Sequence, residues 1–513
     1  MKTQVLIIGG GATGTGLIRD LALRGVECLL VEKQDINAGA SGGNHGLLHS
    51  GARYVSKDGD AAVECMEEGR IIKKVAPECV EETGGLFVAV EGDDEAYAGE
   101  FPGMCEKFGI PYKEIDAKQA MEMEPVLSEK LIASYVVEDA TIDPFMLSLE
   151  NISHARSLGS KVLRYNRVAG FNISNGKIVS TTLINTKSGD RTDVEADVIV
   201  NAAGGWAANV ASIAGAKIGM MYSKGTLLVT QNRITSRVVN RLRQASDADI
   251  LVPGGTVSIL GTTSVTVDSP DDIYPTIQEV DNIIREGGDM IPLLSSARYI
   301  RAFSGVRPLV SSGDGDGRSV SRGYTLIDHE SEGIENFVSI TGGKLTTYRL
   351  MAEKTADLVC KKIGVTAPCK TRTEPLPVSH DGRWAEPASA PKFWVKNNNP
   401  DDTLLCECEM VSKKVVTNIV NAIKEQKAIP TITDVGLRSR IGKGPCQGAF
   451  CGIRVAAHMY DTNERNGNEG VEDLKEFINA RWRGQRSLLA DVQLAQADLQ
   501  EALQCGLYGL DIA

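Results

Sequence analysis

A glycine-rich turn near the N-terminus constrains the fold more than any other stretch of this 513-residue chain. An apolar run at 5–8 (VLII) leads directly into GGGATG at 9–14. Residues Thr15–Arg24 have apolar residues at helical spacing, and a second apolar run at 28–31 ends in Glu32. This order of strand, glycine turn, helix, strand and acid predicts the βαβ unit that binds an adenine dinucleotide.

Three glycines of this turn have predicted roles. Gly9 permits the tight turn, Gly11 lets the backbone approach a pyrophosphate, and Gly14 lets the helix pack closely on the strand. The N-terminus of the helix then offers free N–H groups to the phosphates. Glu32, 18 residues after Gly14, is expected to accept hydrogen bonds from ribose hydroxyls, which argues against NADP.

The segment that follows, residues 33–56, is rich in glycine and serine and carries two histidines, His45 and His49. An NAD-dependent dehydrogenase normally continues here with another regular helix. A glycine-rich run instead lets the backbone approach a flat ring closely. We therefore predict that this segment lines the binding site, the alternative being a surface loop with two polar histidines.

Two later stretches repeat the pattern of strand, glycine turn and helix. Residues 198–206 (VIVNAAGGW) restore the parallel sheet after an insertion. Residues 337–348 (FVSITGGKLTTY) are predicted to present N–H groups and Lys344 to the far side of the cofactor, unless this turn is only a helix start. Between them, residues 217–310 are predicted to be mostly strands and contain the motif SGVRPL.

Composition excludes several classes of protein. The net charge is −12 and no basic stripe is present, so the sequence does not predict nucleic-acid binding. No run of about 18 apolar residues is present, so no transmembrane segment is expected. The first residues lack the pattern of a signal peptide, and we expect a reducing compartment.

Four of the eleven cysteines are clustered. Cys406 and Cys408 form one close pair, and Cys446 and Cys451 form another after 37 intervening residues. Two such pairs, each on a loop before a helix, can bring four thiolates to one point. Four thiolates suit zinc or a [2Fe–2S] cluster. Structural zinc sites favour two residues between paired cysteines, whereas the spacings here are one and four, so iron–sulfur is favoured over zinc or bare thiols.

Taken together, the motifs resemble a known family. The segments GGGATGTG, ASGGNHGLLHSGARY, SGVRPLV, TGGKLTTYRLMAE and CEC…CQGAFC, together with Glu32, are similar to those of the A subunits of anaerobic glycerol-3-phosphate dehydrogenases. The resemblance covers nearly the whole chain. One departure is Gly43, where the family often carries arginine, and it affects one side-chain contact near the flavin.

The resemblance implies an α/β fold with three parts. A Rossmann-like, glutathione-reductase-like FAD-binding domain of the D-amino-acid-oxidase type is interrupted by a mixed-sheet α+β substrate domain and followed by a small helical [2Fe–2S] domain. We expect the oxidoreductase domain at 1–365, with its FAD part at about 1–75, 145–215 and 320–365 and its substrate part at about 76–144 and 216–319. A proline-rich linker (366–402), the cluster domain (403–460) and a helical tail (461–513) are expected to follow.

The resemblance also implies the activity. The enzyme would oxidise sn-glycerol 3-phosphate to dihydroxyacetone phosphate, with the hydride passing to flavin N5. Electrons would then pass through the [2Fe–2S] centre to partner subunits and on to membrane quinone. The chain would be cytoplasmic and peripheral to the membrane through those subunits.

A phosphate ester with a secondary alcohol requires cations and a base. Arg307 is the first choice for the phosphate because arginine binds it bidentately, followed by Arg53 and Lys344, with Tyr54 as a hydroxyl donor. His49 is the candidate base and His45 the alternate, although either could merely orient or pack against the flavin. The predicted FAD-binding residues are Gly9, Gly11, Gly14, Glu32, Lys33, Ser41, Asn44, Leu48, Val168, Gly204 and Gly343.

Two other interpretations stay open. The chain could be a flavin oxidase or dehydrogenase of another hydroxy or amino acid, but an oxidase passes electrons straight to oxygen and has no need of the cysteines. It could also be a non-catalytic flavin and iron–sulfur redox protein, but the density of His, Arg and Lys argues for catalysis.

Overall fold

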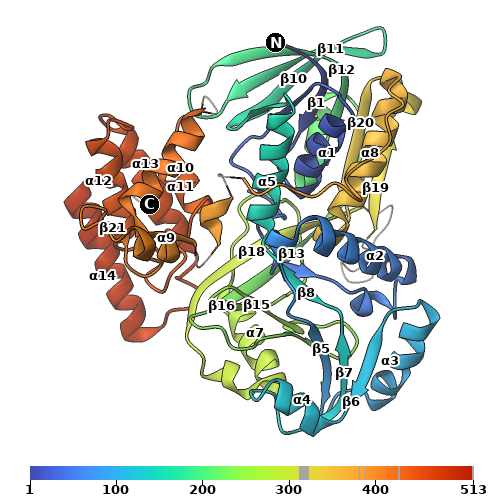
Figure 1. The fold of residues 1–513 in the computed structure, drawn as a ribbon, viewed down its shortest axis with the longest axis vertical. Helices are drawn as coiled ribbons and strands as arrows, with labels where there is room; N and C mark the ends of the chain where they lie inside the picture. Colours follow the sequence, from blue (N-terminus) through green and yellow to red (C-terminus); the bar gives the residue numbers. More distant parts are fainter. Residues whose placement is uncertain (311–322, 380–381, 387–388, 426–427, 511–513) are drawn as a thin grey trace.

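The computed structural model describes residues 1–310, 323–379, 382–386, 389–425 and 428–510. Figure 1 shows two regions built on sheets, one above the other, and a helical C-terminal part beside them. The expected limit between the substrate and FAD parts, near residue 320, lies outside the described residues.

The upper sheet contains eight strands. Its centre runs in the order β9-β2-β1-β12-β20 with all strands parallel, and β19 pairs antiparallel with β20. The β10–β11 hairpin extends it by pairing with the first half of β12. The strands are β1 (Lys2–Ile8), β2 (Cys28–Val31), β9 (Lys161–Leu163), β10 (Asn166–Ser174), β11 (Lys177–Asn185), β12 (Arg191–Asn201), β19 (Tyr324–Asp328) and β20 (Phe337–Gly342).

Both faces of this sheet are covered, which explains why its central strands are unbroken apolar runs in the sequence. Val5 and Ile7 pack into the core shared with α1, α5 and α8, whereas Leu6 and Ile8 point to the opposite core, which contains α6 and the β10–β11 hairpin. The helices are α1 (Ala12–Leu23), α5 (Pro144–Ser157), α6 (Ala207–Ile213) and α8 (Tyr348–Ile363).

The lower sheet contains nine strands and is mostly antiparallel. Its order is β17-β13-β16-β15-β14-β5-β7-β6, and the long strand β18 pairs with β13. The strands are β5 (Gly85–Val90), β6 (Tyr112–Ile115), β7 (Leu131–Val137), β13 (Met220–Thr230), β14 (Val238–Arg241), β15 (Ile250–Gly254), β16 (Val257–Gly261), β17 (Val265–Val267) and β18 (Tyr299–Val310). Helices α3 (Glu95–Lys107), α4 (Ala117–Met123) and α7 (Ile277–Met290) accompany it. The expected α/β class, with a second mixed sheet inserted into a Rossmann-like domain, is confirmed.

Smaller elements join the two sheets. Strands β3 (Leu47–Leu48), β8 (Ala140–Ile142) and β4 (Val80–Glu81) form a three-stranded sheet, and helix α2 (Gly59–Val75) lies beside it. Short 3₁₀ helices lie at Ala52–Tyr54, Pro77–Cys79, Gly204–Trp206, Pro292–Ser295, His329–Glu332, Leu345–Thr347 and Arg383–Ala385.

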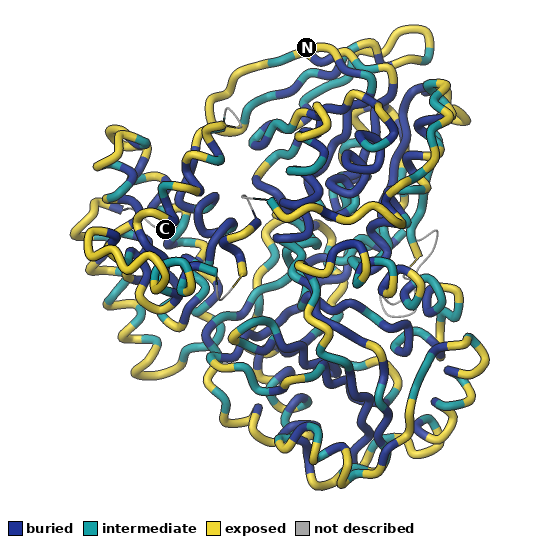
Figure 2. The backbone as a smooth tube through the Cα atoms, in the orientation of Figure 1, coloured by how far each residue is buried: buried dark blue, intermediate teal, exposed yellow. Residues whose placement is uncertain are grey.

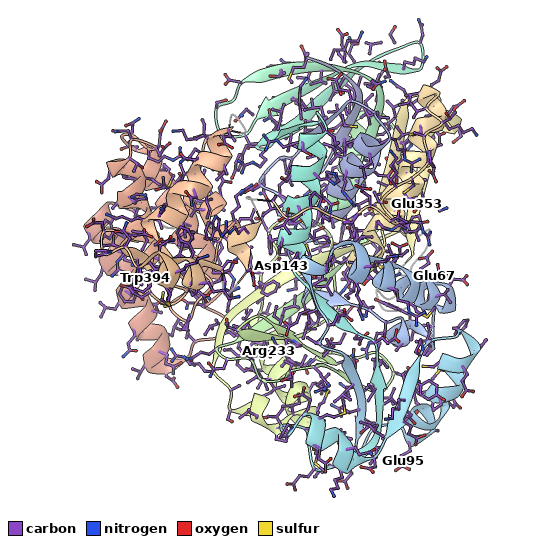
Figure 3. All side chains as sticks on the ribbon, in the orientation of Figure 1. Glu67, Glu95, Asp143, Arg233, Glu353 and Trp394 are labelled. Carbon is purple, nitrogen blue, oxygen red and sulfur yellow. The ribbon has the colours of Figure 1, made fainter. Side chains whose placement is uncertain are left out.

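The C-terminal part has its own hydrophobic core. Its elements are α9 (Ser389–Asn397), β21 (Leu404–Cys406), β22 (Val411–Ser412), α10 (Lys413–Glu425), α11 (Ile432–Leu437), α12 (Cys451–Asp461), α13 (Glu469–Arg483) and α14 (Asp491–Tyr508). The core contains Leu474, Ile478 and Trp482, which the sequence places on one face of a helix. It also contains Trp384 and Ala390, so part of the segment expected to be a linker packs into this core. Figure 3 marks Trp394 of α9 on this part of the molecule. The expected domain boundaries stay a prediction.

One predicted strand is interrupted. The sequence predicts a single strand at Val162–Ile173, but the structure breaks it into β9 and β10 at Arg164 and Tyr165. Tyr165 adopts a φ of +56°, and the Arg164 side chain turns into a buried group of charges. The polar pair at the break is therefore used for an ion cluster rather than for strand pairing.

Figure 2 shows that burial is concentrated along the central strands and that the exposed residues lie mainly on the outer loops and helices. Among the described residues, no helix combines the length and the apolar character needed to cross a membrane.

A buried ion pair joins α8 to α2. Arg349 donates to both carboxylate oxygens of Glu68, at 2.7 and 2.6 Å, and both side chains are almost fully buried. We predict that Arg349→Met lowers the free energy of unfolding by about 3–5 kcal/mol, because Glu68 is left as an unpaired buried charge. Arg70→Met, which removes the exposed pair with Glu138, should cost less than about 1 kcal/mol. Urea denaturation of the two variants checks the difference, and equal losses would contradict this assignment.

Candidate active site

A cavity of about 840 Å³ is lined by residues of both large sheets. All the predicted catalytic residues line it, namely His45, His49, Arg53, Tyr54, Arg307 and Lys344. The predicted cofactor residues that line it are Gly9, Gly11, Glu32, Lys33, Ser41, Asn44, Val168, Gly204 and Gly343. Gly14 and Leu48 do not. One cavity thus collects residues from six separate stretches of the sequence, while their individual roles stay predictions.

The glycine turn has no room for side chains. A Cβ at Gly9, whose φ is +118°, would lie 2.4 Å from the Ala202 carbonyl oxygen. A Cβ at Gly14 would lie 2.0 Å from the Gly9 carbonyl oxygen, so Gly14 shapes the turn from behind rather than lining the cavity. Between them, the backbone opens onto the cavity beside Gly11. This cradle fits the pyrophosphate of a dinucleotide.

Glu32 holds the turn in shape. Its carboxylate accepts hydrogen bonds from the backbone N–H groups of Gly10, at 2.7 Å, and Gln34, at 2.8 Å. Burial raises its pKa above the ordinary value. The neighbouring Lys33 places its ammonium 3.6 Å from the centre of the Trp206 ring. Trp206 also lines the cavity and was not predicted as a site residue, although its position directly after a glycine turn could have indicated it.

The glycine-rich loop is braced from within. The Asn44 amide donates to the carbonyl oxygens of Ala40 and Ser41, and its oxygen accepts from the Gly46 N–H. Leu48 faces away from the cavity and packs against Ile72 and Leu147, whereas Leu47 lines the cavity. Because alternate residues of a strand face opposite sides, a shift of one position accounts for the difference.

The two histidines of the loop are electrostatically coupled. Burial lowers the pKa of His45 to about 3, with further lowering by Arg307 and Arg53. Burial also lowers the pKa of His49 well below 6.5, helped by His45 and Lys344. Within the described part of the chain, His45 Nδ1 is buried without a hydrogen-bond partner, and His49 Nε2 lies 3.4 Å from the Tyr54 hydroxyl. Both imidazoles are therefore neutral and able to accept a proton at neutral pH.

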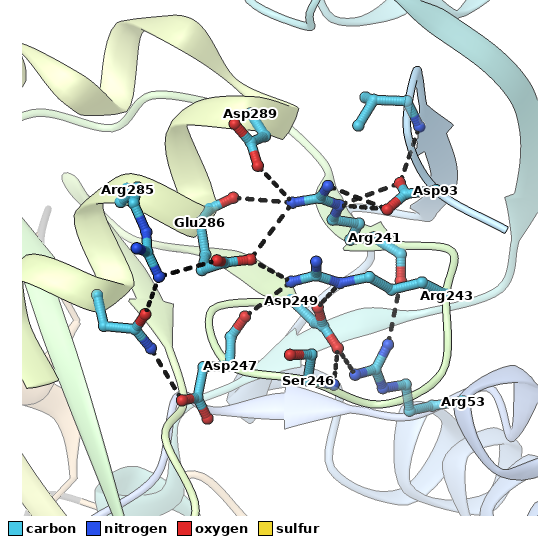
Figure 4. Close-up of polar contacts among 12 residues, drawn as sticks. Arg53, Asp93, Arg241, Arg243, Ser246, Asp247, Asp249, Arg285, Glu286 and Asp289 are labelled. Carbon is cyan, nitrogen blue, oxygen red and sulfur yellow. Dashed lines mark hydrogen bonds and ion pairs between the residues drawn. The ribbon is translucent and has the colours of Figure 1, made fainter.

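Arg53 is fixed by a network of charges behind the cavity (Figure 4). Its guanidinium donates to Asp249 Oδ2 at 2.5 Å and to the Arg241 carbonyl oxygen at 3.2 Å. Asp249 also pairs with Arg243, which continues the network to Glu286. Sequence reasoning did not find this network because its members are scattered over several strands and loops.

Arg307 and Lys344 approach the cavity from different elements. Arg307 lies on β18, and its guanidinium donates to the Thr263 carbonyl oxygen at 3.2 Å and to the Thr262 hydroxyl. Lys344 follows β20 and places its ammonium 5.1 Å from the centre of the Tyr54 ring. Together with Arg53, these two cations give the cavity a strongly positive lining suited to an anion.

The four clustered cysteines come together in the C-terminal part. Cys451 hydrogen-bonds with Cys406 and Cys446, and Cys446 also hydrogen-bonds with Cys408. The hydrogen bond from Cys451 lowers the pKa of Cys446 to about 5. Cys406 and Cys451 are buried, whereas Cys408 is exposed. In the described ranges, no group of three or more His, Cys, Asp or Glu side chains forms a preassembled metal site.

The glycines around the cysteines serve two purposes. Gly442, Gly448 and Gly452 leave space for the Phe477 ring of α13. Backbone N–H groups of Gly448 and Phe450 also hydrogen-bond Cys446.

Comparison with known proteins agrees with this geometry. Residues 4–358 match the family described as FAD dependent oxidoreductase, which defines the class. The chain is 40% identical to the A subunit of the anaerobic glycerol-3-phosphate dehydrogenase from Escherichia coli K12, over 99% of this chain and 97% of that protein. The corresponding protein of Haemophilus influenzae is 39% identical over 100% and 94%. The chain belongs to the family of these A subunits, as its motifs predicted.

A solved structure shares the fold. The glycerol-3-phosphate dehydrogenase from Bacillus halodurans, determined with FAD, superimposes with a TM-score of 0.67 at 23% identity and covers 96% of each chain.

The glycine turn provides a direct test of the dinucleotide site. We predict that Gly14→Ala lowers FAD content at least about tenfold, because the added Cβ would collide with the Gly9 carbonyl group. Gly25→Ala is the matched control, since no described atom lies within 4 Å of a Cβ there and only its positive φ opposes the change. The ratio of flavin to protein absorbance reports the result. Full flavin content in Gly14→Ala would contradict the role of this turn.

The state of His45 can be measured separately. We predict that its imidazole does not titrate between pH 5 and pH 8, because its pKa of about 3 lies below that range. Carbon-13 NMR of histidine-labelled protein follows the six histidines, and His45→Gln assigns the resonance. A midpoint near 6.5 would show that burial and the cations of the cavity do not act on this residue.

Proposed function

We propose that this chain oxidises sn-glycerol 3-phosphate to dihydroxyacetone phosphate. The observation that carries the proposal is the convergence of Arg307, Arg53 and Lys344 with two neutral histidines on the cavity that the glycine turn opens into. A dianionic phosphate needs the cations, and a secondary alcohol needs the base. The names of the A subunits in this family support the same substrate.

The phosphate is assigned to Arg307. Its contacts with Thr262 and Thr263 hold the guanidinium in place, so less freedom is lost when it binds an anion. Lys344 supplies a second positive charge from a different element. Arg53 contributes through its charge, since its hydrogen bonds already tie it to Asp249.

His49 is assigned as the base that accepts the proton of the substrate hydroxyl, with His45 as the alternate. As the C–H bond breaks and the hydride leaves with two electrons, the O–H proton passes to the neutral imidazole and the carbonyl group forms. A bound FAD would supply the two-electron acceptor. A bound phosphate dianion also offsets the positive charges that depress the histidine pKa values, which makes the base stronger when substrate is present.

The four cysteines are proposed to hold a [2Fe–2S] cluster that relays electrons singly to partner subunits and membrane quinone. Their sulfur-only donor set and the N–H groups facing Cys446 support a thiolate site. The interaction of the four thiols with one another lowers the pKa of Cys406 and Cys446 and raises the pKa of Cys451, while burial and the same interaction raise the pKa of Cys408. The exposed Cys408 offers a route by which electrons leave. The naming of the relatives as A subunits supports the existence of partner subunits.

An anaerobic visible spectrum of the purified chain, before and after addition of glycerol 3-phosphate, tests both halves. Bleaching of the flavin bands supports the substrate, and about two iron atoms per chain supports the cluster. A flavin that stays oxidised would overturn the substrate assignment, and zinc in place of iron would overturn the relay.

We predict that Arg307→Ala raises KM for glycerol 3-phosphate at least about 100-fold, because a charged, two-point phosphate contact is lost. Arg167→Ala is the control, and its KM should stay close to that of wild type. Arg167 also lines the cavity, but it lies on β10 of the upper sheet, whereas Arg307 lies on β18 of the lower sheet. Steady-state kinetics with an artificial electron acceptor measures both variants. An unchanged KM in Arg307→Ala would show that another cation binds the phosphate.

A further inference from the structure

Four buried charges join the C-terminal part to the oxidoreductase part. Arg164 Nη1 lies 3.0 Å from Asp35 Oδ1 and 2.6 Å from Asp434 Oδ1, and Arg438 Nη1 lies 3.0 Å from Asp35 Oδ2. Asp35 follows β2, and Arg164 lies between β9 and β10. Asp434 lies within α11, and Arg438 directly follows that helix. None of the four side chains is more than 9% exposed. We call these four residues the seam cluster.

The seam cluster pairs two carboxylates with two guanidinium groups, and among the described residues Arg164 Nη2 and Arg438 Nε have no hydrogen-bond partner. Burial and the neighbouring Asp35 raise the pKa of Asp434 to about 6. Burial alone would raise the pKa of Asp35, but Arg438 and Arg164 hold it far below its ordinary value. Asp434 also accepts hydrogen bonds from the Tyr165 hydroxyl at 3.0 Å and the Thr431 N–H at 2.9 Å. Apolar contacts hold two surfaces together at a lower desolvation cost than buried ions do. Paired charges instead specify a single arrangement of the C-terminal part relative to the oxidoreductase part.

On one side, the seam cluster is attached to the glycine turn. Asp35 follows Glu32 by three residues, and the next residue, Ile36, packs against Gly10, with its Cδ1 atom 2.9 Å from where a Cβ would lie. The Asn37 N–H donates to the Gly10 carbonyl oxygen at 3.1 Å. The position of α11 is therefore tied to the cofactor turn itself.

On the other side, the chain continues from α11 to the second cysteine pair. Lys443 places its ammonium 5.6 Å from the centre of the Phe145 ring. The Phe145 ring in turn lies against Gly42, 2.9 Å from where a Cβ would lie, and the neighbouring Gly43 lines the cavity. Phe145 thus lies between the cavity loop and the loop that leads to Cys446. Figure 3 marks Asp143, two residues before Phe145, at this boundary.

We propose that Asp434 and Arg438 are positioning residues for electron transfer, which hold the cysteine loop against Phe145 through their pairing with Asp35 and Arg164. The proposal rests on the proposed function, in which electrons pass one at a time from the reduced flavin to the oxidised cluster. Loss of the pairing would let the C-terminal part, whose core includes Trp384 and Ala390, move relative to the oxidoreductase part while the chemistry of the cavity continues.

The test uses the holoenzyme with three variants and a control. Arg438→Met removes one charge, and Asp434→Asn removes another without changing shape, so that one variant remains if the other does not fold. Arg438→Lys tests rescue by a retained positive charge. Lys187→Met is the matched control, because Lys187 pairs with Glu476 across the same boundary, at 2.8 Å, but both side chains are exposed.

Two measurements are made on each variant. The first is the rate of limited proteolysis within residues 366–402. The second is anaerobic stopped-flow absorbance after mixing with glycerol 3-phosphate, which separates flavin bleaching from the later reduction of iron. In Arg438→Met and Asp434→Asn we expect cleavage to be about tenfold faster and iron reduction about tenfold slower, with flavin bleaching within about twofold of wild type. Lys187→Met should match wild type, and Arg438→Lys should recover part of the loss.

Wild-type cleavage and iron-reduction rates in both charge-removing variants would overturn the proposal. If the wild-type flavin does not bleach, or if no iron is present, the proposed function fails, and that failure is visible in the wild type alone. The proteolysis rates still decide in that case whether the seam cluster holds the two parts together. Faster cleavage with unchanged iron reduction would assign the seam cluster to stability and overturn its positioning role.

Discussion

The close approach of two backbone segments at the end of β1 underlies the arrangement of the cavity. Gly9 donates its N–H to the Val31 carbonyl oxygen at 2.8 Å, while the Ala202 N–H donates to the Ile8 carbonyl oxygen at 2.8 Å. Three strands therefore end at one point, and any side chain at Gly9 would separate them. Because the helix α1 begins there, its free N–H groups face the space that the strand ends enclose. The other walls of the cavity are built around this fixed corner.

The cavity collects positive side chains, whereas the chain as a whole is negatively charged. The protein carries a net charge of −12, yet the cavity collects Arg53, Arg307 and Lys344. Long-range attraction of an anion is therefore weak, and recognition depends on short-range contacts inside a low-dielectric space. The buried network behind Arg53 neutralises part of this charge, which leaves Arg307 and Lys344 as the cations suited to a bound phosphate.

Local patterns predicted those features that depend on adjacent residues. The βαβ unit and the glycine-rich cavity loop follow from spacing and turn chemistry. Features that depend on distant residues were not predicted. The seam cluster draws on four positions across some 400 residues of chain, and no periodicity marks any of them. The Leu48 side chain faces away from the cavity because the side of a two-residue strand is set by its partner β8, not by its own sequence, and its predicted contact with FAD stays a prediction. The break at Arg164 was missed for the same reason, since the ion pair that causes it lies in another part of the chain.

Strand β18 has a mechanical consequence for the whole molecule. At one end, the Ala302 N–H donates to the Gly484 carbonyl oxygen of the C-terminal part at 2.7 Å, and at the other end Arg307 enters the cavity. The strand is paired with β13 along this entire stretch, so it behaves as a rigid spacer of about 3.4 Å per residue. The separation between the C-terminal part and the anion-binding charge is therefore a fixed length. A single inserted residue between these points would turn Arg307 to the other face of the sheet, so this stretch tolerates substitution but not a change in length.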